Sequence, residues 1–206
     1  MLILSFDTAT DIATACVWRD GRVLAESATH ARSVAAQRVL ADADRLMGDA
    51  GVTTADLDVI VAGTGPGTFT GLRIGLAAAR ALGFALGIPV KGVSTLDALR
   101  AGDRVEVACV DARRGEVFAA GAGLDAQAIA PEALAEALPP GTVCAGDGAI
   151  RHRDLLGGLE IPADDSPLHV PWARHHAALA ERAGPPDPLY IRAPDADRAL
   201  AARAAS

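Results

Sequence analysis

Two segments combine residue types that can bind a phosphate group or a metal ion. In the first, Asp7 ends the apolar run of residues 2–6 and is followed by the hydroxyl residues Thr8 and Thr10. In the second, residues 63–67 place three glycines between an apolar run and a helical pattern. A glycine-rich turn before a helix can bind phosphate through free backbone N–H groups and the helix dipole. The candidate phosphate contacts of this turn are Gly65, Gly67 and Thr68.

Each segment also has a structural interpretation that needs no ligand. Asp7 can cap the following turn by accepting hydrogen bonds from neighbouring N–H groups. The glycines can form a tight turn that lets the next helix pack closely. The turn is not a Walker A loop, because no Gly-Lys-Ser/Thr follows, and it lacks the Gly-x-Gly-x-x-Gly spacing of a dinucleotide site. For each segment the sequence leaves both interpretations open.

The histidines and cysteines give no sign of a metal site or an activated nucleophile. No two histidines have the spacing of a zinc motif, and no serine or cysteine is placed by the sequence beside a histidine base. We therefore expect no catalytic residue and no metal ligand, and we expect the cysteines to be buried, reduced thiols. These residues are His30, His152, His169, His175, His176, Cys16, Cys109 and Cys144.

The elements around these segments follow an α/β order. Apolar runs predict strands, a turn at Asp20-Gly21 predicts a hairpin, and apolar residues at helical spacing predict two long helices. The first half therefore reads β-β-β-α-β-α-β. Its expected strands cover residues 2–6, 12–18, 22–26, 57–62 and 89–93, and its expected helices cover residues 34–47 and 70–86.

The second half repeats this plan weakly, with a strand that ends at Asp111 as the first strand ended at Asp7. The repeat predicts two related β-β-β-α-β-α lobes around a cleft, the actin-like or ribonuclease-H-like plan, with lobes at residues 1–102 and 103–206. Residues 184–188 predict a rigid linker, and the tail beyond Pro194 predicts a frayed helix. The further elements expected are strands over residues 105–110, 116–120 and 143–146 and helices over residues 131–138 and 172–183.

The composition indicates a protein that acts through partners. The chain is 50% hydrophobic but only 3% aromatic, so small aliphatic residues must build its core. A net charge of -7 is not the basic footprint of a protein that binds RNA alone, so we expect a partner to hold any RNA. We expect no signal peptide and no run near the roughly 20 apolar residues of a membrane helix, because Arg80 interrupts residues 74–86. We therefore expect a cytoplasmic protein without membrane contact.

Four blocks along the chain resemble the TsaB family, also called YeaZ. The most specific block is residues 65–75 (GPGTFTGLRIG). Residues 121–174 match the family poorly. The resemblance implies an actin-like fold and a non-catalytic role in placing threonylcarbamoyl groups on tRNA adenosines next to the anticodon. The other blocks are residues 4–10 (LSFDTAT), residues 92–96 (GVSTL) with 110–118 (VDARRGEVF), and residues 188–192 (PLYIR).

The resemblance also implies a set of partners. These are TsaD, the related catalytic subunit that carries the metal, and TsaE, a P-loop ATPase of the same assembly. It implies that tRNA is bound only through the complex, that ATP or ADP binds only within the complex, and that the lone chain can pair with itself. In TsaD the metal histidines lie four apart on the first long helix. Here residues 34–40 contain no histidine, and Ala35 stands where many family members keep one.

In TsaB-like proteins two helices pack with the equivalent pair of TsaD as a four-helix bundle. The corresponding helices here are those expected over residues 34–47 and 70–86, and small residues would let the partner's helices approach closely. Glycine inside a helix costs about 0.5–1 kcal/mol relative to alanine, so its use implies a packing reason. That reason is either the partner or the chain's own sheet. The predicted partner contacts are Ala35, Ala36, Val39, Ala43, Met47, Gly71, Arg73, Gly75, Ala79, Arg80 and Gly83.

Two enzyme hypotheses stand beside the scaffold hypothesis. An actin-like ATPase or kinase would act through Asp7 and residues 63–67, but the lobes are short and residues 145–149 are the one candidate for a second phosphate loop. A peptidase is suggested by glycoprotease-named proteins of this group, yet the sequence offers no ligand set or nucleophile dyad for it. Nucleotide turnover by the purified chain, with and without TsaD, separates the scaffold from the ATPase.

Overall fold

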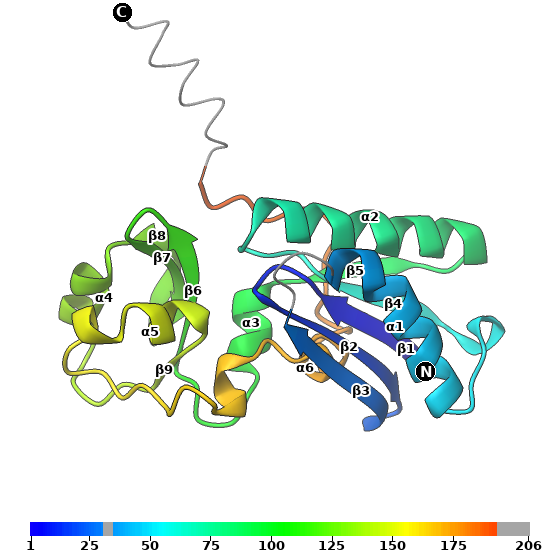
Figure 1. Ribbon diagram of the computed structural model, residues 1–206, viewed down its shortest axis with the longest axis horizontal. Helices are drawn as coiled ribbons and strands as arrows, with labels where there is room; N and C mark the ends of the chain where they lie inside the picture. The colour runs from blue at the N-terminus through cyan, green and yellow to red at the C-terminus, as the bar shows by residue number, and fades with distance from the viewer. Residues whose placement is uncertain (31–34, 193–206) are drawn as a thin grey trace, which may run out of the picture.

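The computed structural model describes residues 1–30 and 35–192, except for the side chains of residues 35–37. Its strands form two sheets that lie side by side, each with helices packed against it (Figure 1). The first sheet has the strand order β3-β2-β1-β4-β5, and the second has the order β8-β7-β6-β9. The chain therefore folds as two mixed α/β lobes.

The first sheet brings Asp7 beside the glycine-rich turn. Strand β1 (Leu2–Asp7) pairs in parallel with β4 (Val59–Gly63), with Phe6 opposite Ala62, so the two strands end at the same edge. The remaining strands are β2 (Ile12–Arg19), β3 (Arg22–His30) and β5 (Val90–Val93).

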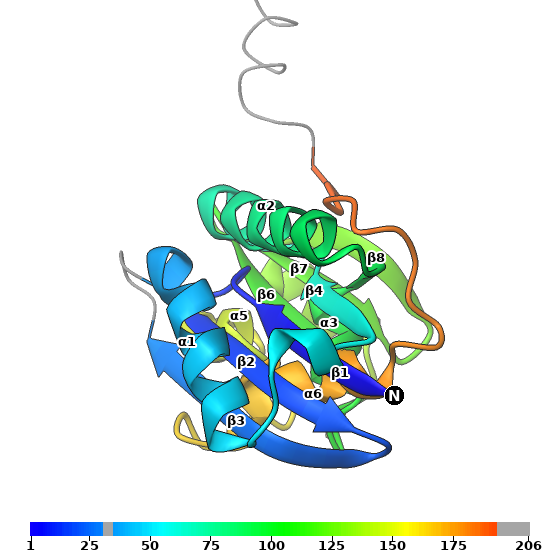
Figure 2. The ribbon, with the colours of Figure 1, turned by 90° about the vertical axis from the view of Figure 1, so that its right-hand side faces the viewer.

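Strand β1 is buried on both faces, because side chains alternate along a strand and both faces are covered. Leu4 and Phe6 belong to the core under α1 (Ala35–Asp49) and α2 (Phe69–Leu86). Ile3 belongs to the opposite core, which α6 (Ala173–Ala178) covers. Figure 2 shows α1 and α2 side by side on one face of the sheet and α6 on the other. This two-sided burial explains the unbroken apolar run of residues 2–6.

The second sheet packs α3 (Thr95–Arg100) against one face, through Leu96 and Leu99, on the side toward the first lobe. Two further helices, α4 (Pro131–Ala137) and α5 (Asp147–Arg151), pack against other parts of the lobe. Its strands are β6 (Val107–Arg113), β7 (Glu116–Gly121), β8 (Leu124–Ile129) and β9 (Cys144–Ala145).

The expected elements occur in the expected order, but the sequence did not predict α3, β8 or α5. The helix expected over residues 172–183 ends at Ala178. Helix α6 also returns to the first sheet, so this lobe is completed by residues from the far end of the chain. The lobe division at residues 102 and 103 stays a prediction. The cysteines are confirmed as buried and free, whereas residue 34 and the tail beyond Pro194 lie outside the described residues.

Helix α2 is more apolar than we expected from the sequence. By length and composition alone it is long enough to cross a membrane, with a mean hydropathy of 1.3 over 18 residues. This corrects the expectation that no run comes near that length, although core helices of soluble proteins pass the same test. Only 28% of the helix is buried inside this chain, so α2 presents much apolar surface to its surroundings.

Candidate functional site

Asp7 is buried, and its carboxylate contacts two helices and the turn that follows β1. The Nε2 atom of His176, on α6, lies 2.9 Å from Asp7 Oδ2. The hydroxyl of Thr95, at the start of α3, donates to the same oxygen over 2.7 Å. The backbone N–H of Ala9 donates to Asp7 Oδ1 over 2.6 Å. Both carboxylate oxygens are therefore satisfied by the chain itself.

The pKa of Asp7 lies below its ordinary value even though the group is buried. Burial by itself raises the pKa, but the hydrogen bond and positive charge of His176 outweigh it, with help from Ala9 and Thr95. The second ring nitrogen of His176, Nδ1, lies 3.2 Å from the carbonyl oxygen of Trp172. Since both ring nitrogens face oxygen atoms, His176 provides Asp7 with an internal cation.

The glycine-rich turn packs against the segment that follows Asp7. The N–H of Thr68 donates to the carbonyl of Ala9 over 2.6 Å, and a Cβ atom on Gly67 would overlap that carbonyl. The carbonyl of Gly65 accepts a hydrogen bond from the Thr95 N–H over 2.8 Å. The hydroxyls of Thr8 and Thr10 donate to the carbonyls of Gly71 and Ile12. This geometry favours the structural interpretation of both segments, and nucleotide binding within a complex stays a prediction.

The small-residue stripe of α2 faces this turn and the sheet. A Cβ atom on Gly71 would overlap the carbonyl oxygen of Thr8, and one on Gly75 would overlap the Thr8 hydroxyl. One on Gly83 would overlap the side chain of Val90. Ala79, which is fully buried, continues the stripe. The stripe is therefore explained by close packing within the chain, which corrects its placement on the partner surface.

The other predicted partner contacts divide by exposure. On α1 the side chains of Val39, Ala43 and Met47 are buried in the core of the first lobe, so their placement on an outer surface is also corrected. Arg73 and Arg80 on α2 are exposed. The side chains of Ala35 and Ala36 lie outside the described part of the chain.

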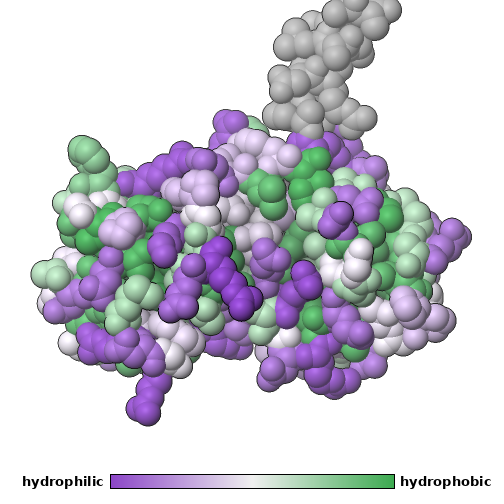
Figure 3. Space-filling model, turned by 180° about the vertical axis from the view of Figure 1, so that it is seen from behind, coloured by the Kyte–Doolittle hydropathy of each residue, from purple (hydrophilic) through white to green (hydrophobic). Residues whose placement is uncertain are grey.

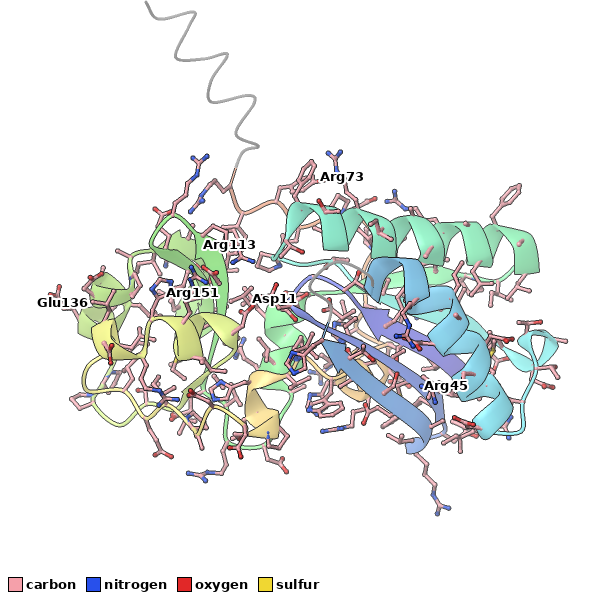
Figure 4. All side chains as sticks on the ribbon, viewed as in Figure 1. Asp11, Arg45, Arg73, Arg113, Glu136 and Arg151 are labelled. Atoms are coloured by element: carbon pink, nitrogen blue, oxygen red, sulfur yellow. The ribbon has the colours of Figure 1, made fainter. Side chains whose placement is uncertain are left out.

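Asp111, the counterpart of Asp7 in the second lobe, also lies close to basic side chains of the chain itself. Its carboxylate lies 3.1 Å from Arg113 and 3.4 Å from Arg151, with His152 at 3.7 Å. Arg113 also lies 3.5 Å from Asp11, which follows β1, and so links the two lobes. Figure 4 shows Arg113 and Arg151 on the side of the second lobe that faces Asp11. Seen from behind, hydrophilic side chains gather where the lobes meet (Figure 3).

Asp147, the first residue of α5, lies beside Asp111 and has a raised pKa. Its Oδ1 accepts a hydrogen bond from the N–H of Asp111 over 3.0 Å. Burial, together with the negative charges of Asp111 and Asp11, raises the pKa of Asp147 to about 6, against the backbone hydrogen bonds from Asp111 and Gly148 that lower it.

Replacing Asp147 with asparagine should therefore make stability less dependent on pH. Because the folded pKa of about 6 exceeds the unfolded value, the contribution of Asp147 is full below about pH 4 and is lost as pH rises through about 6. Relative to wild type, the variant should gain up to about 3 kcal/mol of unfolding free energy between about pH 4 and 7. Urea unfolding at both pH values measures this, with the exposed β8 acid Asp125→Asn as control. An equal difference at both pH values would contradict the expectation.

Sequence reasoning missed His176 and Thr95, which complete the Asp7 site from positions far along the chain. The adjacent His175-His176 pair was the available signal, since only one of two neighbouring helix residues can face the core. His175 instead hydrogen-bonds the carbonyl of Ala98 and is partly exposed. Within the described residues no group of three His, Cys, Asp or Glu side chains is arranged to hold a metal ion.

Comparison with known proteins places the chain in a family. Residues 24–140 match the family described as "TsaD: tRNA N6-adenosine threonylcarbamoyltransferase". An uncharacterised protein of Mycobacterium tuberculosis is 41% identical over 201 residues, which cover 94% of this chain and 93% of that protein. "tRNA threonylcarbamoyladenosine biosynthesis protein TsaB" of Escherichia coli is 37% identical over 125 residues, 57% of this chain. The match spans about half the length of that TsaB protein, 53%.

Solved structures with the same fold support this family assignment. "YeaZ from Pseudomonas aeruginosa" superposes with a TM-score of 0.75 and 26% identity, over 92% of this chain and 99% of that one. Two mixed α/β lobes, with Asp7 and Asp111 near the ends of corresponding strands, define an actin-like, ribonuclease-H-like protein, and the predicted fold class is confirmed. The chain belongs to the TsaD family and, within it, to the TsaB or YeaZ group. The resemblance seen in the sequence is thereby confirmed.

Proposed function

We propose that this chain is a non-catalytic subunit in the threonylcarbamoyladenosine modification of tRNA and binds a TsaD-type catalytic subunit. The names of the relatives support the pathway. The observation that carries the proposal is a set of large apolar side chains left exposed on the outer surfaces of the two long helices, Phe84 on α2 and Leu40 on α1. Phe84 on α2 is 92% exposed, and Leu40 on α1 is 49% exposed. A large aromatic side chain left in water beside an apolar helix is typical of a protein interface.

The Asp7 site supports the non-catalytic part of this proposal. An ATPase or kinase of this fold would need the Asp7 carboxylate free for a metal ion. Here His176, Thr95 and the N–H of Ala9 contact that carboxylate, and the carbonyl of Ala9 accepts the N–H of Thr68 at the end of the glycine-rich turn. A peptidase would need an activated nucleophile. Among the described residues no serine or cysteine side chain is hydrogen-bonded to a histidine ring. The purified chain should therefore show no ATP turnover above background.

The remaining parts of the proposal follow the family. A TsaE-type ATPase joins the same assembly, tRNA is bound only through the complex, and ATP or ADP binds only there. The chain works in the cytoplasm without membrane contact, and α2 is covered by protein. Without its partner, the same exposed apolar side chains pair two copies of the chain.

Replacing Phe84 with glutamate should weaken binding to a TsaD-type subunit more than tenfold while leaving the chain folded. The side chain is 92% exposed, so folding buries little of it, whereas a charge would be desolvated in the interface. Loss of a central aromatic contact costs about 2 kcal/mol or more, which is over tenfold in Kd. Calorimetric titration with TsaD measures the loss, and circular dichroism checks the fold. Leu155→Glu, at an exposed leucine of the second lobe, is the control. If Leu155→Glu weakens binding and Phe84→Glu does not, the partner surface lies on the second lobe.

A further inference from the structure

An arginine near the N-terminal end of α2 contacts two aromatic side chains. The guanidinium carbon of Arg73 lies 3.7 Å from the ring centre of Phe69. Its Nε donates a hydrogen bond to the hydroxyl of Tyr190 over 3.2 Å. The Phe69 and Tyr190 rings are stacked, with centres 6.1 Å apart and planes at 28°. Arg73 is therefore fixed in one direction, and Figure 4 shows it projecting from α2 away from the sheets.

Tyr190 belongs to residues 186–192, here called the C-terminal strap, which is fastened along α2. The N–H of Leu189 donates to the carbonyl of Thr64 over 2.8 Å. Arg80 donates to the carbonyl of Pro186 and to the carboxylate of Asp187, both over 2.7 Å. These bonds place Tyr190 beside Arg73 before any partner arrives, so little conformational entropy is left to lose on binding.

The two arginines of α2 differ in their contacts with the C-terminal strap. Arg80 forms an ion pair with the carboxylate of Asp187. For Arg73, by contrast, the described ranges 1–30 and 35–192 provide no ion pair. Because the Nε of Arg73 is bound to Tyr190, the two terminal nitrogens remain as a fork that matches a carboxylate.

We propose that Arg73, held by Phe69 and Tyr190, is an anchor that receives a carboxylate side chain of the TsaD-type partner. The inference rests on the proposed function and adds to it the chemistry of one contact. Phe69 and Tyr190 are 49% and 43% exposed, so a partner that meets Arg73 also covers both rings. Arginine and tyrosine are the residue types that contribute most at protein interfaces.

A carboxylate fits this anchor better than an RNA phosphate. Binding to a polyanion draws its affinity from several basic groups along the backbone. Here the nearest arginine on the same helix, Arg80, is already neutralised by Asp187. A single guanidinium that has no ion pair within the described part of the chain matches one carboxylate.

The test measures Kd for TsaD by calorimetry at low and high salt for Arg73→Ala, Arg73→Lys and Tyr190→Phe. We expect at least a tenfold loss for Arg73→Ala and most of that loss for Arg73→Lys, because lysine lacks the planar fork. Tyr190→Phe keeps the stacked ring but removes the hydroxyl, so a loss of a few-fold is expected. The loss for Arg73→Ala should shrink at high salt. Arg22→Ala, an exposed arginine on the distant β2–β3 hairpin, should bind as wild type does.

The outcomes separate this inference from the proposed function. If wild type binds TsaD and Arg73→Ala binds equally well, the anchor is wrong and the proposed function stands. If wild type does not bind TsaD, the proposed function itself fails. If Arg73→Ala leaves assembly intact and weakens only the retention of tRNA by the complex, the anchor receives a phosphate and the carboxylate assignment is overturned.

Discussion

Replacing His176 with alanine should lower the free energy of unfolding by about 3–5 kcal/mol, because it leaves a buried carboxylate without its cation. Asp7 and His176 are both fully buried, and their ion pair spans 2.9 Å. Water cannot replace the imidazolium at full strength inside the core. Urea unfolding followed by circular dichroism measures the loss at neutral pH.

Two further variants show whether the lost charge pair is the cause. The double variant Asp7→Asn/His176→Ala removes both charges and should recover part of the loss, since only a cavity remains. His175→Ala, which removes a partly exposed ring bonded to Ala98, should cost only about 0.5–1.5 kcal/mol. Equal losses for the two single histidine variants would refute the internal cation.

The same pair predicts how the protein responds to acid. The folded pKa of Asp7 is depressed, so its contribution to stability is present above about pH 4 and is lost as pH falls through the folded value. The Asp7→Asn/His176→Ala variant should lack this part of the acid dependence.

Gly71→Ala should destabilise the protein by about 1–3 kcal/mol, although alanine is the better helix former. The added methyl group would overlap the carbonyl oxygen of Thr8, which is backbone and cannot rotate away. Gly48→Ala is a matched control, because Gly48 is also helical but a methyl group there meets open space. It should gain about 0.5–1 kcal/mol. Thermal unfolding of both variants measures the contrast, and a stabilised Gly71→Ala would show that α2 does not need its close approach to the turn.

The strands and the two long helices could be predicted because each carries its own periodic pattern. The runs of residues 2–6 and 59–62 are apolar on both faces, and both lie in buried strands, although the second strand begins at Val59 and not at the expected residue 57. The role of the glycines could not be predicted, because a phosphate and a neighbouring carbonyl demand the same absence of a side chain. Only the fold shows that the carbonyls of Thr8 and Ala9 take that space.

The partner face of α2 was misplaced for a related reason. Both faces of this helix are apolar, so periodicity could not say which one covers the sheet. From the sequence we expect the small residues on the outward face, whereas in the structure they lie on the inner face, where the turn after Asp7 comes closest. The outward face carries Phe84, Arg73 and Arg80 instead. The Asp7 site was incomplete in the sequence because its cation comes from a helix of the other half.

The return of α6 to the first sheet has a consequence for how the protein is made. The ribosome adds Asp7 long before its counter-ion His176, which lies far along the chain on α6. Until α6 is made, the Asp7 carboxylate has no counter-ion from His176, and the face of the first sheet around Ile3 and Val61 is not covered by α6. The nascent first lobe therefore cannot mature as an independent unit, and a shortened transcript that ends before α6 encodes an incomplete lobe.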